Sequence, residues 1–254
     1  MIVLITPTGA RPAQFDICTH LMKQQTYTGE VMWIIVDDAY PVSIDKVTDD
    51  FRDGWTIVKV HPSPRWSTGQ NTQARNIAAG VQAMKDRIGE TAEAIFIIED
   101  DDYYRPVYLE RMMARKGHDL WGEMKTIYYN VQHRRHITNA NTIHASLFQT
   151  AFRPAAIPAM IKSLPNKFID CVFWTLVPDR ILFQEGDLAI GIKGMPGRGG
   201  IGAGHSRAMN MTPDFQLNWL KSKIGSDAIL YERYYGGDRV QQHPLFNRAR
   251  PRQR

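Results

Sequence analysis

"FIIEDDDYYRP", residues 96–106, decides how we interpret the fold of this chain. An apolar run of strand length, "AIFII", ends directly in four consecutive carboxylates, Glu99–Asp102. At the end of a buried segment these like charges repel one another and lose hydration. Mg²⁺ and Mn²⁺ select tight clusters of oxygen ligands, so a divalent ion would remove the repulsion. The alternative is a solvated acidic loop that helps to start the helix expected after Pro106.

Strands and helices alternate in the part of the chain that precedes this stretch. Apolar runs of strand length occur at Ile2–Thr6, in "VMWIIVDDA" and in "WTIVKV". Apolar residues have helical spacing at about Pro12–Gln24 and at Asn71–Ile88, where Asn71 or Thr72 can cap the start. This alternation predicts βαβ units, and hence an α/β fold with a mixed, mostly parallel, Rossmann-like sheet flanked by helices.

The polar residues at the strand ends predict where a ligand binds. In open α/β sheets, ligands bind beyond the carboxyl ends of the strands. Those ends carry Thr6, Pro7 and Thr8 after the first strand, and Asp37 and Asp38 after the second. The acidic run follows the fourth strand, so we expect the polar chemistry on one edge of the sheet.

The second half of the chain has a less regular pattern. We expect a strand pair at about Lys125–Asn130 and Ala145–Phe152. Short helices are expected near Pro154–Ser163 and Asp170–Val177, and "DLAIGIKG" is typical of a strand. These elements predict one domain, residues 1–230, followed by a basic C-terminal tail, residues 231–254.

Composition and charge limit the class of protein. With 43% hydrophobic and 22% charged residues among 254, the chain has the composition of a soluble globular protein. Lys and Arg exceed Asp and Glu by 31 − 26 = 5, which hints at a polyanionic partner. The two cysteines, Cys18 and Cys171, lack metal-like spacing and suit a reducing compartment. With no signal peptide and no membrane-spanning run, the expected location is the cytoplasm, that of the host if the protein is viral.

Several stretches, in order, resemble the nucleotide-sugar glycosyltransferases of the GT-A fold, particularly family 2. The buried strand and "EDDDYYRP" are similar to the family's DxD region. "VLITPTGARP" resembles its first strand and nucleotide loop, and "WIIVDDA" the second strand, whose aspartates contact base and ribose. "TGQNTQARNIAAGVQAM" resembles the stretch where an Arg-Asn pair opens a helix, and "FIDCVFWTLV" stands where the family has its catalytic carboxylate. The resemblance covers about residues 1–180. It implies that the expected domain has a nucleotide-binding half, residues 1–105, and an acceptor half, residues 106–230.

The resemblance implies a donor site for a nucleoside-diphosphate sugar and a site for Mn²⁺ or Mg²⁺. The residues expected to bind the nucleotide sugar are Thr6, Pro7, Thr8, Arg11, Asp37, Asp38, Arg75, Asn76, Asp100 and Arg198. Those expected to bind the metal are Asp101, Asp102 and His205. The chain departs from the family because a glutamate begins its acidic run. Which two carboxylates form the DxD pair therefore stays open, although Asp101 serves in either register.

The residues of the expected donor site also have simpler interpretations. Arg75 and Asn76 lie in the first turn of their expected helix, where an arginine can hold a phosphate with two N–H groups. The alternative is a surface arginine. Asp37 and Asp38 can accept hydrogen bonds from a base or ribose, or they can simply cap the end of a strand.

Asp170 begins an apolar helical stretch, and the resemblance gives it the role of general base. In inverting transfer a carboxylate removes the proton of the acceptor hydroxyl as the anomeric carbon is attacked. The alternative is a favourable charge at a helix N-terminus.

The glycine-rich stretch "GMPGRGGIGAGHS" can bring backbone amides close to an anion. Arg198 adds positive charge there, and His205 can complete the metal site, as a late histidine does in several GT-A enzymes. Histidine suits Mn²⁺ better than Mg²⁺. The alternative is a glycine loop that holds no ligand.

Of the expected ligands, the acceptor is the one least clearly indicated by the sequence. "YYNVQHRRHITNANTIHAS" combines Arg134 and Arg135 with histidines and aromatic residues, which suits phosphates and stacked bases but also a solvated surface. The compact chain and "GRGGIGAGH" are similar, more loosely, to phage-type transferases that glycosylate hydroxymethylated pyrimidines in DNA. DNA is therefore the expected acceptor. The alternatives are a saccharide or small molecule, or a non-catalytic nucleotide-binding relative in which the acidic run is structural.

Overall fold

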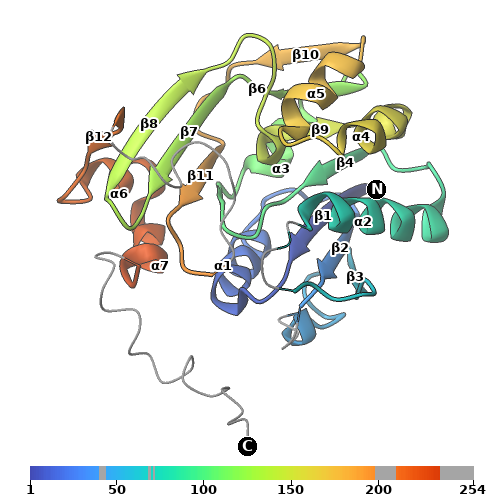
Figure 1. The fold of residues 1–254 in the computed structure, drawn as a ribbon, viewed down its shortest axis with the longest axis horizontal. Coiled ribbons are helices and arrows are strands. Elements are labelled where there is room, and N and C mark those ends of the chain that lie inside the picture. The colour runs from blue at the N-terminus through green and yellow to red at the C-terminus, as the bar shows by residue number, and fades with distance from the viewer. Residues whose placement is uncertain (40–43, 68–69, 71, 198–209, 235–254) are drawn as a thin grey trace, which may run out of the picture. The chain divides into compact units, whose positions relative to one another are not determined.

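A computed structural model of the chain describes residues 1–254 with the exception of 40–43, 68–69, 71, 198–209 and 235–254 (Figure 1). The chain forms two compact units. The larger consists of Met1–Ile127 and Thr138–Gly191, and the smaller falls within Tyr128–Ile137 and Ile192–Arg254. The domain boundaries expected from the sequence stay a prediction.

The larger unit is built on a seven-stranded sheet in the order β10-β6-β9-β4-β1-β2-β3. Its strands are β1 (Ile2–Thr8), β2 (Val31–Asp37), β3 (Trp55–Val60), β4 (Ala94–Ile97), β6 (Leu120–Glu123), β9 (Thr150–Phe152) and β10 (Arg180–Phe183). Neighbouring strands are parallel from β4 to β3, and β10 is parallel to β6, whereas β9 is antiparallel to both of its neighbours. The expected α/β fold with a mixed, mostly parallel sheet is confirmed.

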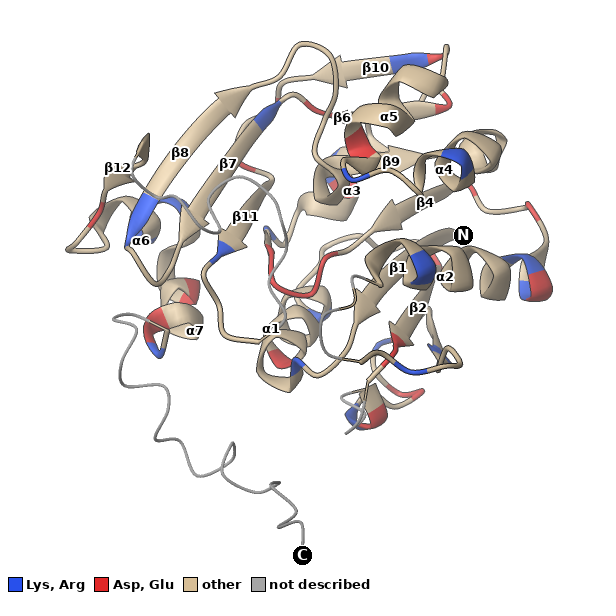
Figure 2. Ribbon diagram, viewed as in Figure 1, with Lys and Arg blue, Asp and Glu red and all other residues tan. Residues whose placement is uncertain are grey.

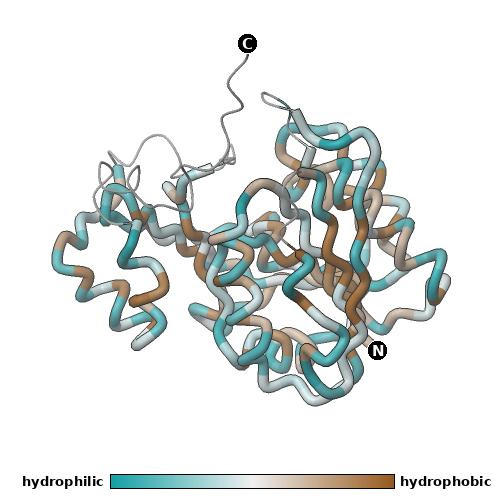
Figure 3. Tube along the Cα trace, turned by 90° about the horizontal axis from the view of Figure 1, so that it is seen from below, coloured by the Kyte–Doolittle hydropathy of each residue, from teal (hydrophilic) through white to brown (hydrophobic). Residues whose placement is uncertain are grey.

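The central strands are buried on both faces, which explains their unbroken apolar sequences. Every residue of β2 and β4 is buried, and the colours of Figure 3 show hydrophobic residues along the strand that begins at the N-terminus. Two helices connect the strands, α1 (Pro12–Lys23) after β1 and α2 (Gln73–Ile88) after β3. On the buried face of α2, a Cβ at Gly80 would lie 2.5 Å from Cγ2 of Ile5. A glycine at this position therefore lets the helix approach β1 closely.

The first strand is longer than its apolar run predicts. It continues through Pro7 to Thr8, two residues beyond the expected run Ile2–Thr6. Proline lacks the N–H that a central strand needs for its ladder. The strand β4 pairs with residues Ile2–Ile5 of β1, and this pairing ends before Pro7. At Pro7, β1 pairs with β2, where Val36 lies opposite.

The predicted strand pair in the second half is wrong. Lys125–Asn130 does form a strand, β7, but it belongs to a five-stranded sheet in the order β12-β8-β7-β11-β5. The expected partner is shorter, because Leu147–Gln149 is a 3-10 helix and only β9 is a strand, which inserts between β4 and β6. The other strands of the second sheet are β5 (Tyr103–Tyr104), β8 (Arg135–Ala140), β11 (Ala189–Lys193) and β12 (Thr212–Pro213).

Short helices complete the described part of the chain. They are α3 (Tyr108–Met113), α4 (Ile157–Ser163), α5 (Ile169–Leu176), α6 (Asn218–Ile224) and α7 (Ile229–Glu232), with 3-10 helices at Ile44–Lys46, Leu147–Gln149, Pro154–Ala156 and Gly225–Ala228. The helices expected near Pro154–Ser163 and Asp170–Val177, and the strand in "DLAIGIKG", are confirmed as α4, α5 and β11. Among the described residues no helix combines the length and apolar character needed to span a bilayer.

The smaller unit is organised around a buried aspartate. Asp214 accepts hydrogen bonds from the backbone N–H groups of Trp219 and Leu220, both at 3.0 Å, at the start of α6. Its carboxylate also accepts one from the hydroxyl of Tyr129 at 3.1 Å. The indole of Trp219 stacks on the ring of His136, with 3.9 Å between ring centroids. These contacts fix the first turn of a helix that is too short to be stable alone.

Candidate nucleotide and metal site

The acidic loop, Glu99–Asp102, follows β4 at the carboxyl edge of the larger sheet and appears as a run of red in Figure 2. Asp100, Asp101 and Asp102 are buried. Glu99, Asp101 and Asp102 each offer one carboxylate oxygen, and these atoms all lie within 4.8 Å of one another. Two side chains hold the loop at Glu99. Gln73 donates a hydrogen bond of 3.3 Å to the Glu99 carboxylate, and the backbone N–H of Glu99 donates one of 2.8 Å to the hydroxyl of Tyr104. Three oxygens are thus close enough to bind one ion.

A guanidinium bridges two members of the acidic loop. Arg11, the residue before α1, places Nη1 3.1 Å from Asp100 Oδ1 and Nη2 2.6 Å from Asp101 Oδ2. Thr8 donates a hydrogen bond of 2.7 Å to the other oxygen of Asp100. The loop from β1 to α1 is strained, because Ala10 adopts a left-handed φ of 53° that alanine seldom has. The end of β1 and the end of β4 are therefore joined through charged and polar side chains.

The negative charges of the acidic loop shift the pKa values of two neighbouring side chains. Burial alone would lower the pKa of the Arg11 guanidinium, but the charges of Asp100 and Asp101 outweigh it and raise that pKa above its ordinary value. Burial, and then the same aspartates, raise the pKa of the Cys18 thiol well above its ordinary value. Arg11 therefore stays a cation and Cys18 a neutral thiol at physiological pH.

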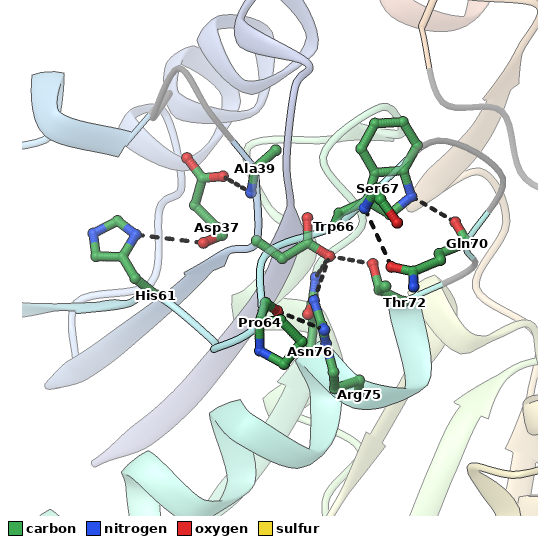
Figure 4. A network of polar contacts seen from close by, with 11 residues as sticks. Asp37, Ala39, His61, Pro64, Trp66, Ser67, Gln70, Thr72, Arg75 and Asn76 are labelled. Carbon is green, nitrogen blue, oxygen red and sulfur yellow. Dashed lines mark hydrogen bonds and ion pairs between the residues drawn. The ribbon is translucent and has the colours of Figure 1, made fainter.

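A second polar cluster, which we name the Asp38 network, consists of Asp38, Thr72, Arg75 and Asn76 (Figure 4). One oxygen of the buried Asp38 carboxylate accepts from the Thr72 hydroxyl, from Asn76 Nδ2 at 2.8 Å and from Arg75 Nη2 at 3.4 Å. Arg75 also donates from Nη1 to the backbone oxygen of Pro64 at 2.7 Å. The network fixes the end of β2 against the first turn of α2. Thr72 is the N-cap residue of α2, but its hydroxyl donates to Asp38 and makes no capping bond.

Asp37 and Thr6 lie near the carboxyl ends of β2 and β1, outside the hydrogen bonds that define the Asp38 network. Asp37 Oδ1 accepts from the backbone N–H of Ala39 at 3.1 Å, and His61 Nδ1 lies 3.4 Å from the Asp37 backbone oxygen, as Figure 4 shows. The Thr6 hydroxyl is fully buried and accepts a hydrogen bond of 2.9 Å from Nε1 of Trp33. Thr6 is thus packed within the sheet, whereas Asp37 terminates β2.

Asp170, the expected general base, lies half-buried in the first turn of α5. Its Oδ1 accepts from the backbone N–H of Cys171 at 2.9 Å. His144 Nε2 lies 3.5 Å from the Cys171 sulfur, and ligand atoms of these three residues lie within 4.8 Å of one another. Burial and then the neighbouring Asp170 raise the pKa of the Cys171 thiol. The carboxylate thus shares its surroundings with an imidazole and a neutral thiol.

The remaining predicted residues fall into two groups. Arg198 and His205 lie outside the described residues, as does most of the basic tail. Arg134 and Arg135 are described, and each donates to a backbone oxygen at 3.1 Å, Arg134 to Phe215 and Arg135 to Met211. These arginines therefore hold β8 and its preceding turn against the segment that leads to α6.

Several residues of these clusters could not be singled out from the sequence. His144 and Gln73 are polar residues in polar stretches, and only the fold brings them to Asp170 and Glu99. Thr72 could be found as a helix cap but not as a partner of Asp38. The sequence leaves the role of Glu99 in the acidic run open, and in the structure one of its carboxylate oxygens lies close to those of Asp101 and Asp102.

Comparison with known proteins bears on the fold. No protein-family model and no curated protein sequence matches the chain. A crystal structure of S. aureus TarS 1–349 in complex with UDP matches with a TM-score of 0.54 and 13% identity, over 75% of this chain and 60% of TarS 1–349. The complex of the same fragment with UDP-GlcNAc matches with a TM-score of 0.51 and 15% identity, over 78% and 60%. The chain thus spans about 60% of the length of these structures.

The fold is of the GT-A type, with a mostly parallel central sheet flanked by helices. The acidic loop fits a divalent ion of the kind that such folds often hold, since its donor set consists of three carboxylate oxygens within reach of one another. Among the described residues this set contains oxygen ligands and no sulfur, which favours Mg²⁺ or Mn²⁺ over ions that prefer sulfur.

Proposed function

We propose that the protein is a glycosyltransferase that uses a divalent metal and moves a sugar, with inversion, from a nucleoside-diphosphate sugar to a hydroxyl group. One observation carries the proposal. Three carboxylate oxygens and a partly buried arginine gather at the carboxyl edge of a GT-A sheet, where ligands of such sheets bind. The TarS structures that share the fold were solved with UDP and UDP-GlcNAc, which supports a nucleotide sugar as donor.

Different residues of the chain would bind different parts of the donor. Asp37 and Asp38, at the end of β2, would accept hydrogen bonds from the base or ribose. Arg11 and Arg75 offer guanidinium groups that suit a diphosphate. Asp101 and Asp102, with Glu99, would hold the ion, and His205 would be a further ligand. A bound divalent ion supplies neutralisation of the diphosphate leaving group.

Asp170 would act as the general base. Its carboxylate would take the proton of the acceptor hydroxyl while the hydroxyl oxygen bonds to the anomeric carbon and the bond to the diphosphate breaks. Asp170 is partly exposed, as a residue that meets an acceptor must be. The neutral thiol of Cys171 beside it does not compete as a nucleophile.

For the acceptor we propose a 5-hydroxymethylpyrimidine in DNA, contacted through Arg134 and Arg135. The net charge of +5 and the basic residues near the aromatic pair His136 and Trp219 favour a polyanion. A saccharide or small molecule is the second candidate, because the same donor chemistry serves any hydroxyl. The third is a nucleotide-binding relative without catalysis.

One experiment separates the three candidates. The protein is incubated with Mn²⁺, a panel of nucleotide sugars, and DNA that contains either ordinary or hydroxymethylated pyrimidines, followed by digestion to nucleosides and mass spectrometry. A sugar-mass increase on the hydroxymethylated base alone supports the DNA acceptor. Donor hydrolysis without transfer to DNA favours a saccharide or small molecule. A protein that binds UDP but turns over no donor would be the non-catalytic relative.

The DNA contact has its own test. Phosphate contacts release counterions, so transfer to DNA should fall steeply with salt while hydrolysis of the donor alone hardly changes. Arg134→Ala with Arg135→Ala should raise the apparent KM for DNA more than that for the donor. Lys162→Ala, an exposed change on α4, is the control. A reaction on DNA that is insensitive to salt would exclude this mode of binding.

A further inference from the structure

Arg11 occupies an unusual position for a residue expected only to bind a diphosphate. Its side chain is 14% exposed and is paired with Asp100 and Asp101, whose side chains are 2% and 9% exposed. Asp101 is at the same time one of the three residues whose oxygens could hold an ion. The carboxylate that would bind the metal is therefore already neutralised by a side chain of the protein.

We infer that Arg11 is an internal counter-cation that competes with the divalent ion for Asp101, so that the ion binds tightly only when a diphosphate offers Arg11 another anion. The inference rests on the metal site of the proposed function and deepens it. It gives the site an order of assembly, in which nucleotide binding favours metal binding.

The competition follows from charge and distance. Arg11 Nη2 lies 2.6 Å from Asp101 Oδ2, and a bound Mg²⁺ or Mn²⁺ would lie about 2.1 Å from a carboxylate oxygen. Two cations on one buried carboxylate repel each other strongly, because few water molecules screen them there. The guanidinium cannot avoid this repulsion by losing its proton, since arginine stays protonated in proteins.

The position of Arg11 also allows it to change partners. Thr8 holds Asp100 from the other side, at 2.7 Å, so Asp100 keeps a hydrogen bond if Arg11 moves. The third donor of the guanidinium, Nε, is buried, and no described residue accepts a hydrogen bond from it. A diphosphate would offer several oxygens to these N–H groups. Arg11 stands directly before α1, beside the strained Ala10, so the loop is already held in a conformation of high energy.

The inference predicts that removing a positive side chain improves metal binding. Titration calorimetry with MnCl₂ alone, on the nucleotide-free full-length protein, compares the wild type with Arg11→Gln and Arg11→Lys. Arg11→Gln should bind Mn²⁺ at least about tenfold more tightly, because it keeps polar N–H groups but removes the competing charge. Arg11→Lys keeps the charge and should stay near the wild type. Lys46→Gln, which removes an exposed lysine paired with Asp16 at 3.5 Å, is the control for overall charge.

UDP provides the second readout. In the wild type, UDP should increase Mn²⁺ affinity by a larger factor than in Arg11→Gln, because only the wild type also gains by transferring Arg11 to the diphosphate. Equal or weaker Mn²⁺ binding by Arg11→Gln, or an unchanged effect of UDP, would overturn the inference. If Arg11→Gln is unfolded without metal, Mn²⁺ should restore its folded circular dichroism spectrum, and failure to do so counts against the inference.

The outcomes distinguish this inference from the proposed function. Equal Mn²⁺ affinity in the wild type and Arg11→Gln removes the role of Arg11 but leaves the metal-dependent transferase intact. If neither protein binds Mn²⁺ with or without UDP, the metal site of the proposed function is wrong, and the inference falls with it.

Discussion

The acidic loop and the Asp38 network lie at strand ends of one sheet, yet they are built in opposite ways. In the Asp38 network a single buried carboxylate accepts from three donor side chains, all on the first turn of α2 or next to it. In the acidic loop, carboxylates lie beside carboxylates, and Arg11 bridges two of them. An acceptor surrounded by donors stabilises a fold, whereas grouped acceptors attract a cation. The difference predicts that the first cluster matters most for stability and the second for catalysis.

Asp101→Asn should have the largest effect on catalysis. It removes a charge shared between the ion and Arg11 while keeping the shape of the side chain, and we expect donor turnover to fall on the order of 10³-fold. Hydrolysis of the nucleotide sugar, measured with saturating Mn²⁺, checks this. The fold should persist, as judged by circular dichroism. Asp16→Asn, an exposed aspartate on α1, is the control and should keep full activity. Undiminished turnover in folded Asp101→Asn would remove the contrast between the two clusters.

Asp170→Asn extends the comparison to a carboxylate that would act on the acceptor. It keeps the size of the side chain but cannot take a proton, so turnover should fall about 10²-fold while donor affinity is retained. Calorimetry with UDP and a transfer assay measure the two quantities separately. A loss of UDP affinity as large as the loss of rate would place Asp170 in donor binding instead. A near-normal rate would move the general base to another residue.

The architecture of the larger unit could be predicted because its signals are local. Continuous apolar runs mark β1, β2 and β4, and helical spacing marks α1 and α2, without knowledge of any distant contact. The gathering of Thr8, Asp38 and the acidic loop at one edge follows from the parallel order of these strands.

What could not be predicted depends on contacts between distant parts of the chain. The strand β9 has only three residues, and its place between β4 and β6 is decided by the sheet and not by its own sequence. Arg11 is separated from Asp100 and Asp101 by most of the first half of the chain, so its ion pairs leave no pattern in the sequence. The same holds for Thr72 and Asn76, whose spacing marks a helix start but not a shared acceptor.

Asp38→Asn should lower the stability of the fold more than Asp101→Asn does. Its amide would replace a charged acceptor with a neutral group that carries two N–H donors, in a buried cluster whose other members donate to that acceptor. We therefore expect the free energy of unfolding to fall by about 2–3 kcal/mol. Urea denaturation at neutral pH measures this, with an unchanged m-value as evidence that unfolding stays two-state. Asp53→Asn, an exposed change between β2 and β3, should leave stability within about 0.5 kcal/mol of the wild type. If Asp101→Asn is destabilised more than Asp38→Asn, the two clusters do not differ in the way proposed.

Glu123 gives a third arrangement, a buried carboxylate bound by backbone donors. It ends β6, is fully buried, and accepts from the backbone N–H groups of Gly186 and Leu188. Burial raises its pKa from the ordinary value of 4.5, and the two backbone hydrogen bonds only partly oppose that shift. The folded protein therefore keeps this proton at pH values where the unfolded chain has lost it.

The smallest effect that we predict follows from this proton. Because the folded state binds it more tightly, the contribution of Glu123 to stability decreases as the pH rises from about 4.5 through the raised pKa. Glu123→Gln carries no titrating proton, so the unfolding free energy of this variant should decline less than that of the wild type over the same interval. Urea denaturation at closely spaced pH values measures both slopes. Glu232→Gln, an exposed change on α7, should keep the wild-type slope. Parallel curves for the wild type and Glu123→Gln would mean that the backbone donors of Gly186 and Leu188 fully offset the effect of burial on the pKa of Glu123.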